Sequence, residues 1–276
     1  MSGAARLDPA TEAAARGWSH AVTAPPPPVT GAVFGAISGA EVTDLVVAPP
    51  VGDRPAFEFG NLSGRLGGSR TEMYGTVQVT INLDSPIAID YGFLSIRLPR
   101  AMPHFVVDAA PNDDAHRSSL PIRIDGAQRV SLEGDADSHF SLFAPRGYER
   151  DALYLFTPDV MALLIDETGD YDVELADDRI TVFAPNPWDL SDPATWKRLE
   201  SLVHILGGKA ARQAGRYRDE RAAPGETVAP QGRRLNQGLL SRRGVGVGVI
   251  VALVVALGLT GAIMIVLFNG ITAPMP

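Results

Sequence analysis

The chain has 276 residues, 45% of them apolar, with 24 Lys or Arg against 32 Asp or Glu and no Cys. This length and apolar content are sufficient for one sizeable globular core. The lack of Cys excludes disulfides, thiolate metal sites and Cys nucleophiles. The acidic excess argues against a nucleic-acid partner, because its phosphates would be repelled.

Residues 1–55 have the composition of a mobile lead-in. The stretches "APPPPVTGAVFGAISGAEV" and "APPVGDRPA" contain a run of four Pro and repeated Gly and Ala, which favour extended or mobile backbone. The first twenty residues lack the apolar run of a secretory signal. We therefore expect the folded domain to occupy residues 56–207.

Within that domain, short stretches alternate apolar and polar residues and are rich in β-branched and aromatic side chains, which predicts strands. The stretches are "AFEFGN", "YGTVQVTIN", "FLSIRL", "HFVVDA", "RVSL", "FSLFA", "YDVELA" and "RITVFA". Between them, "GRLGGSR" and "ADDR" have the composition of hairpin turns. Neighbouring strands should therefore be antiparallel.

Helix signals come late in the domain. Thr157–Pro158 and Asp192–Pro193 each place a capping residue before a Pro at the first helical position. Gly169 follows the first helix, and Gly207–Gly208 is expected to end the second. The predicted class is α+β, with a largely antiparallel sheet and two to three late helices.

Three segments of the predicted domain resemble segments of a known group of proteins. "FEFGN", "YGFLSIRLPRAMPHFVVD" and "LEGDADSHFSLFAPRGYERDALYLFTPDVMALLID" resemble segments of a group of actinobacterial membrane proteins. More distantly, they resemble a bacterial domain of unknown function with a strand, an acidic turn and a "Leu-Thr-Pro…Met" helix. The resemblance covers residues 56–206 and is most specific over 140–164. It implies a membrane context and transfers no activity, cofactor or catalytic residue.

The C-terminal region predicts a membrane anchor. Residues 244–268, "GVGVGVIVALVVALGLTGAIMIVLF", carry no charge and no Pro; 25 helical residues are long enough to cross a hydrocarbon core of about 30 Å. Residues 208–243, a predicted basic linker, contain nine Lys or Arg and three acids, whereas residues 269–276 contain no charged side chain. The positive-inside rule then predicts a tail-anchored protein of the cell membrane, with a cytoplasmic N-terminal domain and an outer C-terminus.

Two further roles are possible at the membrane. Clustered Arg residues beside a span attract anionic lipid headgroups, although the same residues also set topology. Gly244 and Gly248 form a Gly-x-x-x-Gly pair that could bring two spans together in a homodimer. The basic residues that flank the span most closely are Arg233, Arg234, Arg242 and Arg243.

A metal site has one weak candidate. Asp135, Asp137 and His139 alternate, so in an extended strand they would share one face and could reach one cation. The stretch fails as a calcium loop, because Phe140 stands where a Gly is needed and no Glu follows at the twelfth position. We expect solvated charge before a strand instead.

Two classes of function remain open. The sequence has no nucleophile elbow, phosphate-binding loop, dinucleotide fingerprint or zinc-protease motif. We therefore expect no cofactor and a non-catalytic domain that binds or scaffolds a protein partner at the membrane. The alternative is a membrane-tethered hydrolase or transferase whose carboxylates converge only in the fold.

Overall fold

The computed structural model describes residues 6–28, 31–66, 69–74, 77–82, 87–113, 118–122, 124–132 and 135–235. They form an α+β fold within a compact unit that ends at Asn236. The helices are α1 (Pro9–Ala15), α2 (Ala32–Ala36), α3 (Ala136–His139), α4 (Glu149–Leu155), α5 (Pro158–Glu167), α6 (Pro193–Leu202) and α7 (Gly208–Arg216). The strands are β1 (Ser19–Ala24), β2 (Ser38–Ala48), β3 (Phe57–Leu66), β4 (Ser69–Tyr74), β5 (Val77–Asn82), β6 (Ile87–Ala109), β7 (Arg129–Val130), β8 (Phe140–Phe143) and β9 (Asp172–Ala184).

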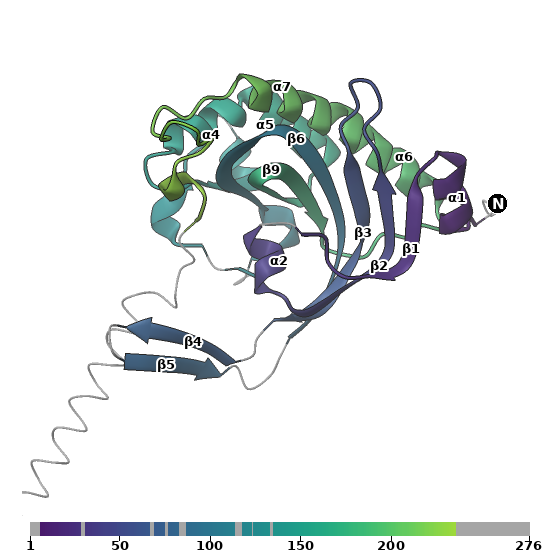
Figure 1. Ribbon diagram of the computed structural model, residues 1–276, viewed down its shortest axis with the longest axis horizontal. Helices are drawn as coiled ribbons and strands as arrows, with labels where there is room; N and C mark the ends of the chain where they lie inside the picture. Colours follow the sequence, from purple (N-terminus) through teal and green to yellow (C-terminus); the bar gives the residue numbers. More distant parts are fainter. Residues whose placement is uncertain are drawn as a thin grey trace, which may run out of the picture. The chain divides into compact units, whose positions relative to one another are not determined.

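Seven strands form one antiparallel sheet (Figure 1), as the sequence predicted. Its order is β1-β2-β3-β6-β8-β7, and β9 pairs with the other edge of β6 along both halves of that long strand. β4 and β5 form a separate two-stranded sheet. The 23-residue strand β6 is therefore the centre of the fold.

One predicted turn is wrong. The "ADDR" stretch lies inside the continuous strand β9, where Asp177 adopts a left-handed φ of 48°. Arg97 pairs with Arg179 and Met102 with Asp177, so four residues of β6 lie opposite one residue of β9. A bulge of this kind bends a strand without reversing it, which explains why turn-like residues did not end β9.

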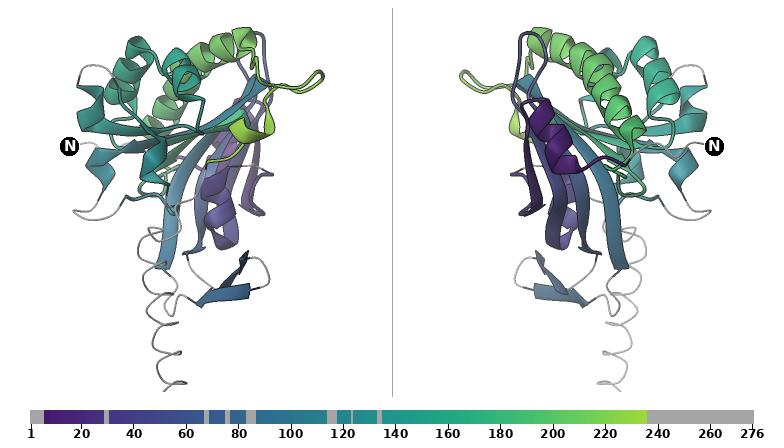
Figure 2. Two further views of the ribbon diagram at one scale, coloured as in Figure 1. Left: turned by 90° about the vertical axis from the view of Figure 1, so that its left-hand side faces the viewer. Right: turned by 90° about the vertical axis from the view of Figure 1, so that its right-hand side faces the viewer.

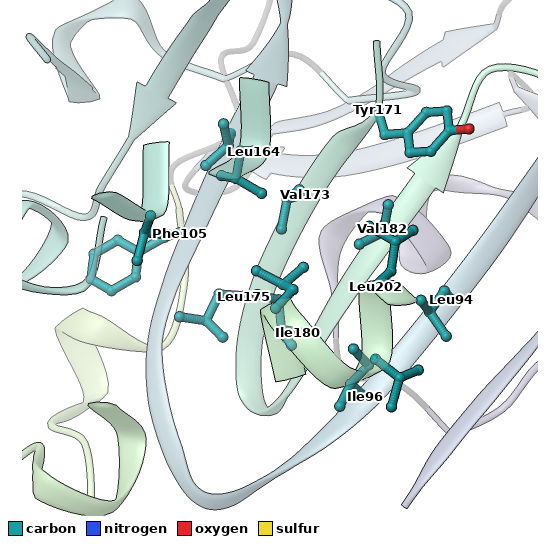
Figure 3. Close-up of a cluster of buried hydrophobic side chains, with 14 of the residues drawn as sticks. Leu94, Ile96, Phe105, Leu164, Tyr171, Val173, Leu175, Ile180, Val182 and Leu202 are labelled. Carbon is teal, nitrogen blue, oxygen red and sulfur yellow. The ribbon is translucent and has the colours of Figure 1, made fainter. Parts of the chain in front are cut away.

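The sheet separates two apolar cores. Side chains alternate along each strand, so neighbouring residues such as Phe93 and Leu94 face different cores. The larger core contains Leu94, Ile96 and the other side chains of Figure 3. α5, α6 and α7 cover this side, whereas α2 covers the other side with Val33 and Phe34.

The two predicted late helices are present. α6 begins at its predicted cap, where the carboxylate of Asp192 accepts a hydrogen bond from the Ala194 amide at 2.9 Å. α5 follows Thr157, but the Thr157 hydroxyl donates to Asp159 at 2.5 Å and makes no capping bond to the backbone. Thr157 therefore sets the start of α5 through its extended backbone rather than through its side chain.

The expected mobile lead-in is wrong for residues 9–28 and 31–48. They form α1, β1, α2 and β2, and β2 pairs with β3 along most of its length. Trp18, Val42 and Val46 from this segment are buried in the cores. Pairing with a distant strand and burial of these side chains outweigh the local preference of Pro and Gly for irregular backbone.

The expected stop at Gly207–Gly208 is also wrong. The helix continues from α6 through a π-helical turn (Val203–Gly207) into α7. A β-carbon at Gly207 would lie 3.2 Å from Ile96, so this glycine permits close packing of the helix on β6. Residues 217–235, which we call the strap, continue along the domain and bury Tyr217, Val228 and Leu235. Much of the predicted linker is therefore folded.

Among the residues that the structure describes, no helix is long and apolar enough to cross a membrane. The predicted span at 244–268 lies outside these residues, as do Arg242, Arg243, Gly244 and Gly248. The anchor and its helix-packing motif stay predictions.

Candidate functional site

A row of buried and half-buried polar side chains follows β6 and β9 on the side that α2 covers. Val106 pairs with Glu174 and Val107 with Val173, so Asp108 and Asp172 come next on the two facing strands. His104 precedes them on β6. Asp172, Glu174 and His104 are 1%, 2% and 4% exposed. We call these four residues, His104, Asp108, Asp172 and Glu174, the polar row.

Glu174 and His104 connect three parts of the chain. Oε1 of Glu174 accepts hydrogen bonds from the Ala32 amide at 2.6 Å and from Nε2 of His104 at 2.7 Å. The opposite ring atom, Nδ1 of His104, accepts the Leu235 amide at 3.3 Å. Because Nδ1 of His104 accepts a hydrogen bond, the ring proton lies on Nε2, which donates its hydrogen bond to Glu174. The start of α2 and the end of the strap are therefore joined through the sheet.

Gly31 is required at this place. A β-carbon there would lie 2.2 Å from a carboxylate oxygen of Glu174. The Val33 amide also donates to Oε2 of Glu174, at 3.3 Å. The glycine lets the backbone approach the buried carboxylate closely enough for amides to solvate it, which a buried charge needs.

Asp172 holds the segment that follows β6. Its Oδ1 accepts the Ala109 amide at 2.8 Å and its Oδ2 accepts the Ser119 hydroxyl at 2.7 Å. Burial raises the pKa of Asp172 to about 7, in spite of these two donors, and the neighbouring Asp108 raises it further. Its surroundings therefore favour the protonated form of this carboxyl.

Asp108 has a related environment. Its Oδ1 accepts the Ser118 hydroxyl at 2.7 Å. Burial raises the pKa of Asp108 to about 6, the hydrogen bond from Ser118 lowers it, and the charge of Asp113 raises it. Two carboxyls on facing strands thus titrate near neutral pH, which is the property required of a proton donor or acceptor.

Tyr91 closes this end of the polar row. Its hydroxyl donates to the Ser119 carbonyl at 2.5 Å, and burial raises its pKa to about 12. Ser119 is therefore held both through its hydroxyl, by Asp172, and through its carbonyl. The contacts of this region bind one part of the chain to another, so its first role is to fix the fold.

A second polar cluster fastens the strap. The Tyr148 hydroxyl donates to Asp219 at 2.6 Å, and Arg221 donates to Asp219 at 2.8 Å and to Asp151 at 2.6 Å. Burial alone would raise the pKa of Asp219, but donors from Ala229, Tyr148 and Arg221 outweigh it and hold the pKa below its ordinary value. Asp219 is therefore a charged anchor of the strap on α4.

A surface depression of about 690 Å³ opens at the bulge of β6 and β9. Its lining includes Arg97, Arg100, Asp177, Asp178 and Thr227. Arg97 donates to Asp178 at 3.0 Å, and Arg100 donates to the Tyr217 carbonyl at 3.1 Å. The ion pair between Arg97 and Asp178 neutralises part of the charge that lines this depression.

The structure places the weak metal candidates on a short helix rather than on a strand. Asp137 and His139 belong to α3, and Asp135 precedes it. Asp137 accepts the Ser131 hydroxyl at 2.9 Å and the Leu132 amide at 3.1 Å. Among the described residues, no group of three metal-binding side chains is close enough to hold an ion.

The described Arg residues of the predicted lipid-facing set lie at the end of the strap. Arg233 donates to the Val228 carbonyl at 3.0 Å and lies 3.7 Å from Glu226. Arg234 is exposed. Among the described His residues, His104 belongs to the polar row, whereas His20 pairs with Asp44 at 3.0 Å.

The sequence analysis missed the polar row. Its Asp and Glu residues alternate with Val in "YDVELA", a pattern that normally predicts a solvated strand face. The signal that could have revealed it was His104 within the apolar stretch "HFVVDA", because a buried imidazole needs a polar partner.

No protein-family model matches the chain, and no curated protein matches it. Among solved structures, the chain is similar to one described as the crystal structure of the mycobacterial trehalose monomycolate transport factor A, TtfA. The TM-score is 0.46 and the sequence identity 8%, over 74% of this chain and 93% of that chain. We draw no conclusion about function from this similarity, and the resemblance to actinobacterial membrane proteins stays a prediction.

Proposed function

We propose that the chain is a single-pass membrane protein with a non-catalytic binding or scaffolding domain at the cytoplasmic face. The apolar segment 244–268 and the nine basic residues that precede it support the anchor and its orientation. The partner would be a protein that the domain recruits or holds at the membrane.

The observation that carries this proposal is the short stretch of sequence between the last described residue, Leu235, and the apolar segment. The domain remains ordered by buried contacts as far as Leu235, which is 6% exposed. Eight residues, 236–243, then lead to the apolar segment. Even fully extended, they reach about 28 Å at roughly 3.5 Å per residue. A domain on so short a tether would act on partners at the membrane surface rather than deep in the cytoplasm.

Membrane extraction and tag accessibility test this proposal together. The full chain should resist alkaline carbonate extraction, whereas a fragment ending at Asn236 should be released as a soluble protein. A C-terminal tag should be labelled only from outside the cell. Release of the full chain by carbonate, or labelling of the tag only from the cytoplasm, would overturn the proposed anchor or its orientation.

The polar row supports the alternative, a membrane-tethered hydrolase or transferase. Asp108 and Asp172 have pKa values of about 6 and about 7, and two carboxyls of this kind can act as general acid and base. Screening the purified full chain against ester, phosphoester and glycoside substrates tests this alternative. Activity that Asp172→Asn abolishes and Asp135→Asn preserves would favour it over scaffolding.

A further inference from the structure

The end of the strap is fixed in position beside α2. The Leu235 amide binds His104, His104 binds Glu174, and the carboxylate of Glu174 binds the first amide of α2 at Ala32. Leu235 also packs in the same apolar core as Val33. The tether toward the predicted span therefore begins at one defined place on the domain.

The segment that contains α2 is uncharged over a long stretch of sequence. No charged residue occurs from Pro25 to Ala40, a segment that includes α2. Gly35 is exposed and Ala36 half-buried, so the outer side of α2 presents small side chains. Such a surface can approach a bilayer without desolvating a charge.

Basic side chains directly precede Leu235, which packs in the same apolar core as Val33 of α2. They are Arg233 and Arg234, and both are exposed. An exposed Arg residue near an anionic leaflet is attracted to the lipid headgroups. We call the surface formed by Gly35, Ala36, Arg233 and Arg234 the exit face.

We propose that the exit face lies against the anionic lipid headgroups of the membrane to which the chain is anchored. This inference rests on the proposed function, because it needs the anchor. The length of chain beyond Leu235 and the place where the fold ends favour the exit face over other surfaces. The occupant is the lipid surface itself, approached closely at α2 and attracted chiefly by Arg234, because Glu226 lies 3.7 Å from Arg233 and offsets part of its charge.

If positive charge alone decided which surface faces the membrane, the surface of α7 would be favoured instead. α7 exposes Arg212 and Arg216 and packs Ala214 into the larger core, on the other side of the sheet from α2. Figure 2 shows α2 and the α6–α7 helix on different sides of the strands. The two hypotheses therefore place opposite sides of the domain against the bilayer.

Two glycines provide a matched test, because the chain has no Cys. Gly35 on α2 and Gly215 on α7 are both exposed and helical, and an added β-carbon at either position would have no heavy atom within 4 Å. Gly35→Cys and Gly215→Cys can each be labelled with a fluorophore in the full chain. The labelled chains are inserted in bilayer nanodiscs of phosphatidylcholine and phosphatidylglycerol that contain a headgroup-attached quencher.

We expect the label on the Gly35→Cys variant to lose most of its fluorescence and the label on the Gly215→Cys variant to retain it. Adding Arg234→Glu to the Gly35→Cys variant should weaken the quenching in anionic discs more than in discs of phosphatidylcholine alone. Equal quenching of the two labels, or stronger quenching at Gly215, would overturn the inference. Failure of the full chain to enter the discs would instead refute the proposed anchor.

Discussion

Replacing Asp172 with Asn tests the energetic account of the polar row. Burial makes the ionised form of Asp172 unfavourable in the folded domain, where its pKa is about 7 compared with 3.8 in its ordinary state. The folded state therefore binds a proton more tightly than the unfolded state. The contribution of this group to stability is fully present below about pH 4 and is lost as the pH rises toward 7.

The size of the effect follows from the two pKa values. At about 1.4 kcal/mol per unit of pH, the difference corresponds to roughly 4 kcal/mol of unfolding free energy. Asp172 is 1% exposed, so solvent does not screen this cost. Asn is neutral at every pH, and its carbonyl can still accept the Ala109 amide while its NH₂ group donates to Ser119. Asp172→Asn should therefore gain stability relative to the parent as the pH rises.

Urea unfolding of the fragment 1–236, followed by Trp fluorescence at pH 5 and pH 8, measures this change. The free energy of unfolding of the variant minus that of the parent should increase by a few kcal/mol from pH 5 to pH 8. The upper limit is the roughly 4 kcal/mol that corresponds to the full difference between the two pKa values. Asp135→Asn, on the exposed turn before α3, serves as the control and should not change the pH dependence. A difference that is the same at pH 5 and pH 8 for Asp172→Asn would refute the reasoning.

Two further substitutions test the packing of α5 on the sheet and the attachment of the strap. Leu164→Ala removes a fully buried side chain of α5 and should lower the free energy of unfolding by about 2 to 5 kcal/mol. The control, Leu153→Ala at a position that is 40% exposed, should lower it by less than about 1 kcal/mol, and equal losses in urea unfolding would contradict the burial of α5. Tyr148→Phe removes the hydrogen bond to Asp219 and should cost roughly 1 to 3 kcal/mol. Limited proteolysis should then cut the strap faster, and an unchanged cleavage rate would show that Tyr148 does not hold it.

Local patterns in the sequence predicted the strands and the late helices. The sequence "FSLFA" places Phe140 and Leu142 on one side, and both are buried in β8. Asp192 and Pro193 identified the start of α6 because the cap and the Pro act within one turn. Such signals depend on neighbouring residues, so they could be read without knowing the fold.

Features that depend on distant pairing could not be read in this way. β2 becomes a strand because β3 pairs with it, although the sequence around it is rich in Gly and Pro. Gly207 and Gly208 looked like a helix end, but the helix continues through both, and the small size of Gly207 permits packing on Ile96. The strap is ordered by contacts such as Tyr148 with Asp219, 71 residues apart. Composition gives no information about partners at that separation.

The polar row was hidden for a related reason. Asp108 and Asp172 alternate with apolar neighbours, which is compatible with a strand face in water and with one beneath another segment. The covering residues, α2, Ser118, Ser119 and Leu235, come from three separate regions of the chain. A strand pattern therefore identifies the two faces of a sheet, whereas only the tertiary fold decides whether a polar face is buried.

The burial of His104 and Glu174 has a consequence for the chain as a whole. Their hydrogen bonds make the position of Leu235 depend on the folded core rather than on the eight residues that follow. A domain attached through a long flexible linker would lose any orientation relative to its anchor. In this protein, buried contacts fix the position of Leu235, and eight residues separate it in the sequence from the apolar segment 244–268. On the proposed anchoring, the same buried contacts that stabilise the fold would limit the orientation of the domain at the membrane.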